Sequence, residues 1–497
     1  MTGIFGNITA RSSYKWLVYS SVAIAAFVTV SDQTGTTLAL PRIGHEFNAD
    51  IPTVQWLYLV YTLFISALLL PMGKLSDTLG RRRIYISGLT VFSAGAVMAY
   101  FGQEFDLLLV AKAIQGVGAA MIQANGLALM VEAFPKRQRA SAIGLYMAAI
   151  GTGAVMGPVL GGLMIDAWGW RSMYLGIAVI GGMEILLSVY VIRDVTGYTN
   201  QNGESRGIRS FDWLGAVLSA GVLSLLLISL TYSYRLGWTN PIVLTGLCVS
   251  LLLLVGFVLR ELQCDDPMID LTLFKIPVFS LGIVARFLAF MSGSPAYFLM
   301  PFYLVQVLGI TESKAALFLA PASVMMAVAS PLSGKLSDRW GTKWLAVIGL
   351  LYWTLGVIIF TRLEVNSSPI LVSVGMILLG AGNGTFGAPN TSAVMNVAGQ
   401  HRYGVVSALV NMVRTSGNLS GIAVGTTMVV ASMTSMGFDP DLSVLMSLDA
   451  TNTLPQEKVA LMGSFVEGIR RAFTLGACLV GFAAVITIFR PDLPVES

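Results

Sequence analysis

The sequence predicts an all-α polytopic membrane protein with fourteen membrane-spanning helices. The first observation is composition, since 55% of the 497 residues are hydrophobic and 11% are charged, whereas a soluble chain has about 25% charged residues. The second is that apolar runs long enough to cross about 30 Å of hydrocarbon recur along the chain. The net charge of +4 is small and the Lys and Arg residues form no long basic tract, which argues against nucleic acid as a partner.

The apolar runs define the predicted helices in order. Short polar turns separate most of them, and two connectors, 193–211 and 431–466, are longer. The first run is too long for the apolar core of a signal peptide, so we expect it to be retained. An even number of spans places both termini on one side of the membrane. The predicted spans are 16–40, 53–73, 84–101, 107–131, 140–164, 172–192, 213–232, 241–259, 278–304, 314–334, 344–361, 369–394, 403–430 and 467–489.

Basic residues set the predicted orientation. The Arg and Lys clusters at 81–83 and 136–139 fall in short loops on the same side as the N-terminus. Short cytoplasmic loops of membrane proteins are enriched in Lys and Arg. We therefore expect a multi-pass protein of the cell membrane (plasma or inner membrane) with both termini in the cytoplasm.

An internal repeat divides the chain into two halves. The sequence Gly-Lys-Leu-Ser-Asp occurs at 73–77 and again at 334–338, each time at the end of the second span of a half. Such self-similarity indicates two related structural units. We expect an N-terminal six-helix bundle at 1–195, a cytoplasmic linker with two additional central helices at 196–275, and a C-terminal six-helix bundle at 276–497.

The repeated segment also carries a family resemblance. It resembles the pattern between the second and third helices of the major facilitator superfamily, specifically its fourteen-span branch of drug:proton antiporters. The matching residues are Gly73, Asp77, Gly80, Arg81 and Arg82, with a weaker copy at Gly334, Asp338, Gly341 and Lys343. The resemblance implies the major facilitator fold and a conformational latch formed by Gly73, Asp77, Arg81, Glu132 and Asp338. A carboxylate and a guanidinium at a helix end can form such a charge-assisted network; the alternative is a positive-inside loop with a tight glycine turn.

The fifth predicted span is similar to the antiporter motif of this family. The matching positions are Gly144, Gly153, Gly157, Pro158, Gly161 and Gly162. Small residues let helices approach closely, and proline removes a backbone donor and permits a kink. The resemblance implies exchange of substrate against protons, and the alternative is an ordinary packing face.

Charged residues inside the first half are the proton-coupling candidates. Asp32 lies in the middle of the first span, within a stretch that resembles the first-helix motif of the same branch, and Glu184 lies deep in the sixth span. Because a carboxyl group in an apolar site favours its protonated form, such a group can take up and release a proton as its surroundings change. The alternative for Asp32 is a carboxylate held by neighbouring Thr and Gln side chains.

Further polar residues are candidates for the substrate cavity. Lys112 and Gln115 stand in the fourth span, where the family motif has Arg followed three residues later by Gln-Gly. Lysine keeps the positive charge, loses the fork geometry of arginine and can deprotonate. Arg286 and Arg414 lie deep in the second half, and Asn383 and Asn411 accompany them. With three cations against two carboxylates inside, we hypothesise an anionic, zwitterionic or neutral amphiphilic substrate. Internal ion pairs or contacts with helix carbonyls are the alternative.

We therefore expect a proton-coupled antiporter that exports amphiphilic or drug-like molecules by alternating access. The alternative is an exporter or flippase of lipid or lipid-like substrates on the same fold. A membrane enzyme is not expected, because two histidines and three scattered cysteines make no catalytic or metal cluster. No phosphate-binding loop occurs in the sequence, so we expect a proton gradient and no cofactor. The expected partners are a small molecule, protons and the bilayer, with the monomer as the functional unit.

Overall fold

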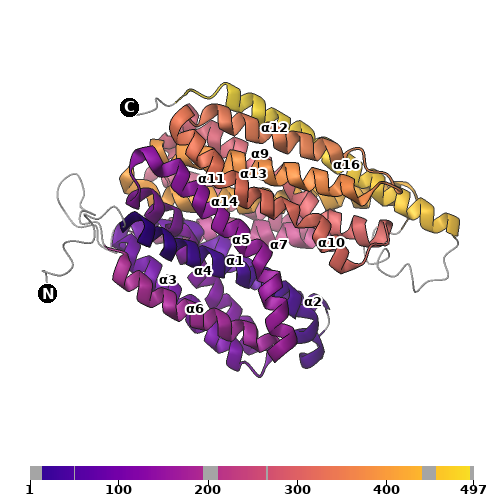
Figure 1. Cartoon of the computed structure of the whole chain (residues 1–497), viewed down its shortest axis with the longest axis horizontal. Coiled ribbons are helices and arrows are strands. Elements are labelled where there is room, and N and C mark those ends of the chain that lie inside the picture. The colour runs from indigo at the N-terminus through magenta and orange to yellow at the C-terminus, as the bar shows by residue number, and fades with distance from the viewer. Residues whose placement is uncertain (1–13, 50, 194–210, 265–266, 439–454, 493–497) are drawn as a thin grey trace, which may run out of the picture.

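The computed structural model describes residues 14–49, 51–193, 211–264, 267–438 and 455–492. Within these ranges every long element is an α-helix, and the helices run along the long axis of the molecule (Figure 1). We call the end where Tyr14 begins α1 and Ile488 ends α16 the N/C end, and the opposite end the far end.

The first half contains six long helices. They alternate in direction because each connection is short, as the sequence pattern predicts. Helix α1 packs mainly on α5, α3 on α4 and α6, and α2 on α4. Their bounds are α1 Tyr14–Phe47, α2 Ile51–Leu79, α3 Arg81–Phe101, α4 Phe105–Ala133, α5 Arg139–Trp168 and α6 Trp170–Val191, with the short helix η1 at Lys136–Gln138.

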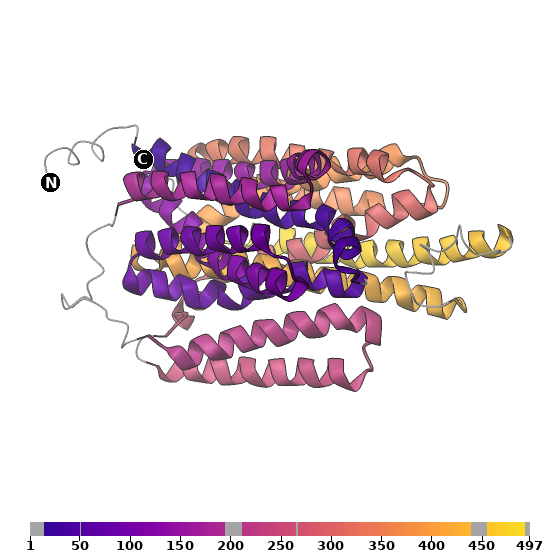
Figure 2. The same cartoon turned by 90° about the horizontal axis from the view of Figure 1, so that it is seen from below.

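Two additional helices follow, α7 (Trp213–Leu236) and α8 (Pro241–Gln263). They are central in the sequence but lie side by side along one side of the bundle (Figure 2), where α7 packs on α2 and α14. Helix α8 exposes large apolar side chains, among them Leu252 and Leu262. Such a face suits contact with hydrocarbon.

The second half repeats the plan of the first. Helix α10 is short and runs into α11 after a single residue, so the two form one predicted span. The bounds are η3 Leu271–Lys275, α9 Pro277–Phe302, η4 Tyr303–Val307, α10 Glu312–Leu319, α11 Pro321–Trp340, α12 Lys343–Phe360, α13 Pro369–Ala398, η5 Gln400–Arg402, α14 Tyr403–Ser435 and α16 Pro455–Ile488.

The helices correspond one by one to the fourteen predicted spans, so the fold class is confirmed. Thirteen of the described helices are long and apolar enough to cross a membrane by length and composition. The fourteenth is α14, a 33-residue helix that is more polar because it carries Asn411, Arg414 and Asn418. Other helices supply its surroundings, since it packs on α2, α4, α9 and α16.

Several helices are longer than predicted. The connector predicted at 431–466 is shorter, because α14 continues to Ser435 and α16 begins at Pro455. The sequence predicts only the apolar part of each helix, so the polar residues at these helix ends are assigned to the connector. The predicted boundary at 195/196 and most of the 193–211 connector lie outside the described residues, so the domain division remains a prediction.

Buried apolar side chains form two cores. The larger core belongs mainly to the first half but continues into α13 and α14 through residues such as Val394, Val406 and Leu409. The second core fills the middle and far part of the second half, around Trp353 and Phe473. The two halves therefore share apolar packing at the N/C end.

Candidate transport site

Asp77 joins the two halves at the N/C end. Its carboxylate accepts hydrogen bonds from the backbone N–H groups of Gly404 at 3.0 Å and Val405 at 2.9 Å, in the first turn of α14. Arg81 holds the same carboxylate at 2.7 Å and donates to Glu132 at 3.1 Å. Unpaired N–H groups at a helix start attract an anion. The predicted latch residues of the first half thus form one network with the second half.

Asp338 makes the equivalent contact in the second half. It accepts from the backbone N–H groups of Ala140 at 3.0 Å and Ser141 at 2.9 Å, and from the Ser141 hydroxyl, at the start of α5. Glycine permits this approach, because a Cβ on Gly73 would lie 2.8 Å from the Gly404 carbonyl oxygen. A Cβ on Gly334 would lie even closer to the Ala140 carbonyl oxygen. The repeated sequence at 73–77 and 334–338 therefore makes the same kind of contact in both halves.

The antiporter-motif residues form the packing surfaces of α5. A Cβ on Gly153 would lie 2.9 Å from the Phe27 carbonyl oxygen of α1, and one on Gly157 would lie 2.8 Å from the Ser31 Cα. Gly161 also faces α1, at Gly35, whereas Gly162 has no atom nearer than 3.9 Å. Pro158 lies inside α5. Close packing explains the glycines at 153 and 157 without a direct role in chemistry.

Asp32 and Lys112 form a buried ion pair between α1 and α4. The Lys112 ammonium donates to the two carboxylate oxygens of Asp32 at 2.9 and 3.1 Å, and to the Thr36 hydroxyl at 2.9 Å. The side chains are 0% and 1% exposed. The rings of Tyr61 and Tyr174 lie 5.3 and 4.7 Å from the ammonium, within cation–π range. The sequence singled out both charges, but only the fold pairs them.

Glu184 occupies a separate buried site. It accepts hydrogen bonds from Ser21 at 2.6 Å and Ser188 at 2.8 Å, between α1 and α6. Gln115 is also fully buried, and its amide nitrogen and oxygen have no hydrogen-bond partner among the described residues. The structure does not bring Glu184 into contact with the Asp32–Lys112 pair.

A cavity of about 460 Å³ lies between the two halves. Along α14 the latch contacts at Gly404 and Val405 precede Asn411, the first residue of this helix on the cavity wall. Of the predicted cavity residues, Asn383, Asn411 and Arg414 line it, whereas Lys112, Gln115 and Arg286 lie outside its described lining. Its other polar and aromatic lining residues include Gln33, Tyr58, Gln123, Tyr146, Tyr297, Trp353 and Asn418.

Arg286 is held behind this wall. It donates to the Val410 carbonyl at 3.0 Å and to the Thr391 hydroxyl at 2.9 Å, and its guanidinium lies 5.3 Å from the Phe290 ring centre. The side chain therefore ties α9 to α13 and α14. This geometry matches the helix-carbonyl alternative that the sequence left open for Arg286.

Arg490 is a further buried arginine, and the sequence does not predict its burial. Arg490 donates to the Asn390 side chain at 3.2 Å and to Thr342 at 3.1 Å. Burial lowers its pKa to about 10. It directly follows the last predicted span at the N/C end, a position where arginine ordinarily faces water. No feature of the sequence distinguishes it from a surface residue.

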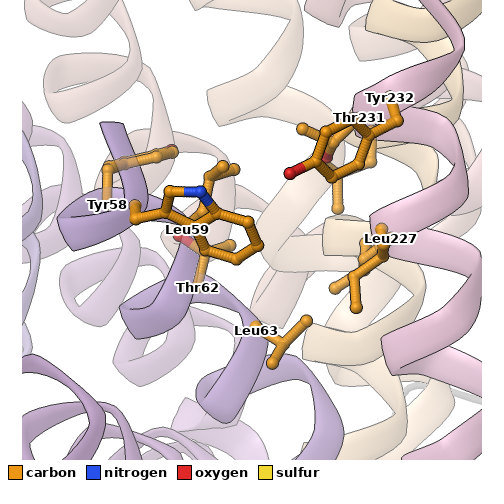
Figure 3. A pocket seen from close by; sticks show the side chains of 10 residues that line it. Tyr58, Leu59, Thr62, Leu63, Leu227, Thr231 and Tyr232 are labelled. Atoms are coloured by element: carbon orange, nitrogen blue, oxygen red, sulfur yellow. The ribbon is translucent and has the colours of Figure 1, made fainter. Parts of the chain in front are cut away.

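An apolar recess adjoins the cavity at α7. It lies between α2 and α7 and is lined by Leu59 and Leu63 on one side and Leu227 and Tyr232 on the other (Figure 3). Tyr58, Thr62 and Leu419 line both the recess and the cavity. The recess and the cavity are therefore neighbours.

Two helical halves around a polar cavity, joined by a repeated contact at one end, are the arrangement of a secondary membrane transporter. The profile of the Major Facilitator Superfamily matches residues 22–422. The chain belongs to this family.

Curated relatives are named for transport, drug resistance and export. The riboflavin transporter RibZ of Clostridioides difficile is 29% identical over 77% of this chain and 81% of its own. Multidrug resistance protein Stp of Mycobacterium tuberculosis is 30% identical over 82% of this chain and 74% of its own. The tetracenomycin C resistance and export protein of Streptomyces glaucescens is 25% identical over 95% and 91%. The chain is thus a family transporter with drug-efflux relatives.

Solved structures agree in fold. The human organic anion transporter MFSD10 (TETRAN) matches with a TM-score of 0.65 at 13% identity, covering 94% of this chain and 99% of that one. The proton:xylose symporter XylE matches with a TM-score of 0.64 at 13% identity, covering 98% of each chain. At this identity the likeness concerns the fold alone.

Proposed function

We propose that this protein is a proton-coupled antiporter that exports amphiphilic or drug-like small molecules across the cell membrane, with the N/C end in the cytoplasm. The observation that carries the proposal is the buried Asp32–Lys112 pair on α1 and α4. Neighbours of Asp32 on α1, Thr29 and Gln33, line the cavity. A proton taken up at Asp32 would therefore act on a helix that also contacts substrate.

The physical basis is the imbalance that one proton creates. Protonation of Asp32 removes the negative partner of Lys112, and a buried ammonium without a carboxylate costs about 3–5 kcal/mol. The pair is intact only while α1 and α4 hold their present spacing. Protonation would therefore favour a different arrangement of these helices, and return of the proton would favour the present one.

The latch supplies the second state. Asp77 and Asp338 join the halves at the N/C end, so this arrangement fits the step in which substrate leaves on the far side. The opposite step needs both contacts to open and the cavity to face the cytoplasm. Rocking of two repeats about a fixed site gives alternating access of this kind.

The substrate class is supported by the relatives. Stp and the tetracenomycin protein are named for drug resistance and export, which favours small molecules over lipids as cargo. Riboflavin in the name of RibZ is consistent with an amphiphilic aromatic molecule. We propose a monomer as the working unit, powered by the proton gradient without a cofactor.

The test is uphill transport in liposomes. Purified protein is reconstituted, a pH gradient is imposed, and accumulation is followed for a panel of fluorescent molecules that includes the cation ethidium, riboflavin and the anion 8-anilinonaphthalene-1-sulfonate. Asp32→Asn should abolish accumulation driven by the gradient, because the amide cannot exchange a proton. Passive exchange of substrate at equal pH should survive, since the cavity lining is unchanged.

The matched control is Asp166→Asn. Asp166 is an exposed carboxylate that pairs with Arg42, so its loss should leave gradient-driven transport near the wild-type level. Uphill accumulation by Asp32→Asn at the wild-type rate would show that another group couples the proton. Absence of transport by the wild-type protein for every drug in a broad panel would reject the drug-export assignment.

A further inference from the structure

We propose that the exported molecule is an amphiphilic organic anion, whose anionic group pairs with Arg414 and whose apolar part extends into the recess between α2 and α7. This inference rests on the proposed export function, because it names the class of molecule that the same cavity carries. Two independent features carry it: the charge of the cavity wall and the apolar space beside it.

The cavity wall is positive at one place. Among the described residues that line the cavity, Arg414 is the only one with a charged side chain. No described carboxylate forms an ion pair with it, and the side chains of Tyr58 and Tyr146 line the same cavity. A guanidinium in a partly desolvated wall presents up to five donors to a planar anion. An anion would supply the missing negative charge.

A second cation reinforces this sign. Arg286 is fully buried and donates to the Val410 carbonyl, about one helical turn before Arg414 on α14. Its hydrogen bonds go to a carbonyl and a hydroxyl, Val410 and Thr391, so its charge is not neutralised locally. By contrast, Asp32 and Lys112 cancel each other. The net field that a substrate meets at this wall is therefore positive, which disfavours a cationic molecule there.

The recess offers room for an apolar group. Its walls are mainly aliphatic and aromatic, with Leu59 and Leu63 of α2 opposite Leu227 of α7, as Figure 3 shows. Trp56 and Tyr232 close it with rings 6.3 Å apart. Burial of apolar surface in such a space stabilises the bound molecule. Helix α7, one of the two additional helices, thereby gains a role, because it supplies one wall.

Head and tail sites are within reach of each other. Tyr58, Thr62 and Leu419 belong to both spaces, and Arg414 lies five residues before Leu419 on α14. At 1.5 Å per residue this is about 7.5 Å along the helix axis. A molecule with an aromatic body and a short alkyl chain can span that distance.

Binding to the purified protein tests the charge preference. The probes are 2-naphthoate and 2-naphthylmethylammonium, which share an apolar body and differ in charge, and affinity is measured by calorimetry at fixed ionic strength. We expect naphthoate to bind at least about tenfold more tightly, the effect of one charge-assisted hydrogen bond. Arg414→Gln should remove the preference and Arg414→Lys should keep most of it. Arg362→Gln, at an exposed arginine, is the matched control.

A second pair of probes tests the recess. Leu227→Trp fills the recess from α7, whereas Val217→Trp changes a residue of α7 that is 67% exposed. We expect Leu227→Trp to weaken 6-propyl-2-naphthoate about tenfold while 2-naphthoate is unaffected, because the loss of buried methylene contacts affects only the longer probe. Val217→Trp should change neither affinity.

The outcomes separate this inference from the proposed function. Equal affinity of the wild-type protein for the anion and the cation, or a preference that survives Arg414→Gln, would overturn the head-group assignment. An equal effect of Leu227→Trp on both naphthoates would overturn the tail assignment. Neither measurement uses a pH gradient, so failure of proton coupling in the Asp32→Asn experiment leaves these results standing, and the reverse also holds.

Discussion

Asp77 and Asp338 make equivalent contacts between the two halves. Each lies in the last turn of the second span of its half and accepts hydrogen bonds from the first backbone N–H groups of a helix in the other half. Asp77 binds the start of α14 at 3.0 and 2.9 Å, and Asp338 binds the start of α5 at 3.0 and 2.9 Å. The first half supplies the carboxylate in one contact and the helix start in the other, so the pair of contacts is pseudo-symmetric. Both contacts lie at the N/C end.

Loss of one latch carboxylate should open that end. Asp77→Asn removes a charged acceptor of two backbone N–H groups and of Arg81, an effect worth about 1.5–3 kcal/mol for hydrogen bonds to a charged group. Cysteines are introduced at the exposed residues Arg83 and His401 of a protein without native cysteines and are spin-labelled. Double electron–electron resonance then measures the distance between the two halves. We expect a population at longer distance in Asp77→Asn. Asp106→Asn, an exposed carboxylate at the start of α4, is the control, and an unchanged distance distribution in Asp77→Asn would contradict the latch.

The glycines of the antiporter motif should differ in how well they tolerate replacement by alanine. Gly157→Ala places a Cβ 2.8 Å from the Ser31 Cα, whereas Gly162→Ala meets nothing nearer than 3.9 Å. Overpacking of this kind destabilises a core by about 1–3 kcal/mol. The thermal unfolding temperature in detergent should therefore fall for Gly157→Ala and remain near the wild-type value for Gly162→Ala. Equal effects would mean that α5 does not approach α1 as described.

Breaking the buried ion pair from the lysine side should cost stability that a second substitution restores. Lys112→Met leaves the Asp32 carboxylate buried without its partner, which is expected to destabilise the fold by about 3–5 kcal/mol. The double variant Asp32→Asn/Lys112→Met removes both charges and should recover most of that loss. Thermal unfolding of both variants and of the wild-type protein measures the difference, and Lys314→Met, at an exposed lysine, is the control. A double variant no more stable than Lys112→Met would argue against direct pairing.

Acid should weaken a contact just outside the spans. Asp270 pairs with Arg402 at 2.5 Å. Burial raises the pKa of Asp270, but hydrogen bonds from Thr272 and the charge of Arg402 outweigh it, so the pKa is lowered overall. A carboxyl with a lowered pKa contributes stability above its unfolded pKa, and this contribution disappears as pH falls through the folded pKa. Asp270→Asn should thus lower the unfolding temperature near pH 7, and its effect should shrink progressively as the pH falls below about 3.9, the unfolded pKa of aspartate. A difference that persists in acid would point to a role other than charge.

The sequence by itself determined the number and order of the spans, the repeat at 73–77 and 334–338, and the identity of the residues that carry charge into the membrane. It could do so because hydrocarbon thickness fixes helix length, and because an unpaired charge in an apolar run is conspicuous. Helix ends were less readable, since the polar ends of α14 and α16 look like connector when hydropathy is the only signal.

Only the tertiary structure decided which of these residues meet. It paired Asp32 with Lys112, 80 residues apart, placed Arg414 on the cavity wall and Arg286 behind it, and set α7 beside α2. Periodicity shows that a residue is inside the membrane, but not which helix face it occupies or which neighbour it faces. Those relationships depend on how the close-packed glycines of α5, α2 and α11 let the helices approach, and therefore on contacts between residues far apart in the chain.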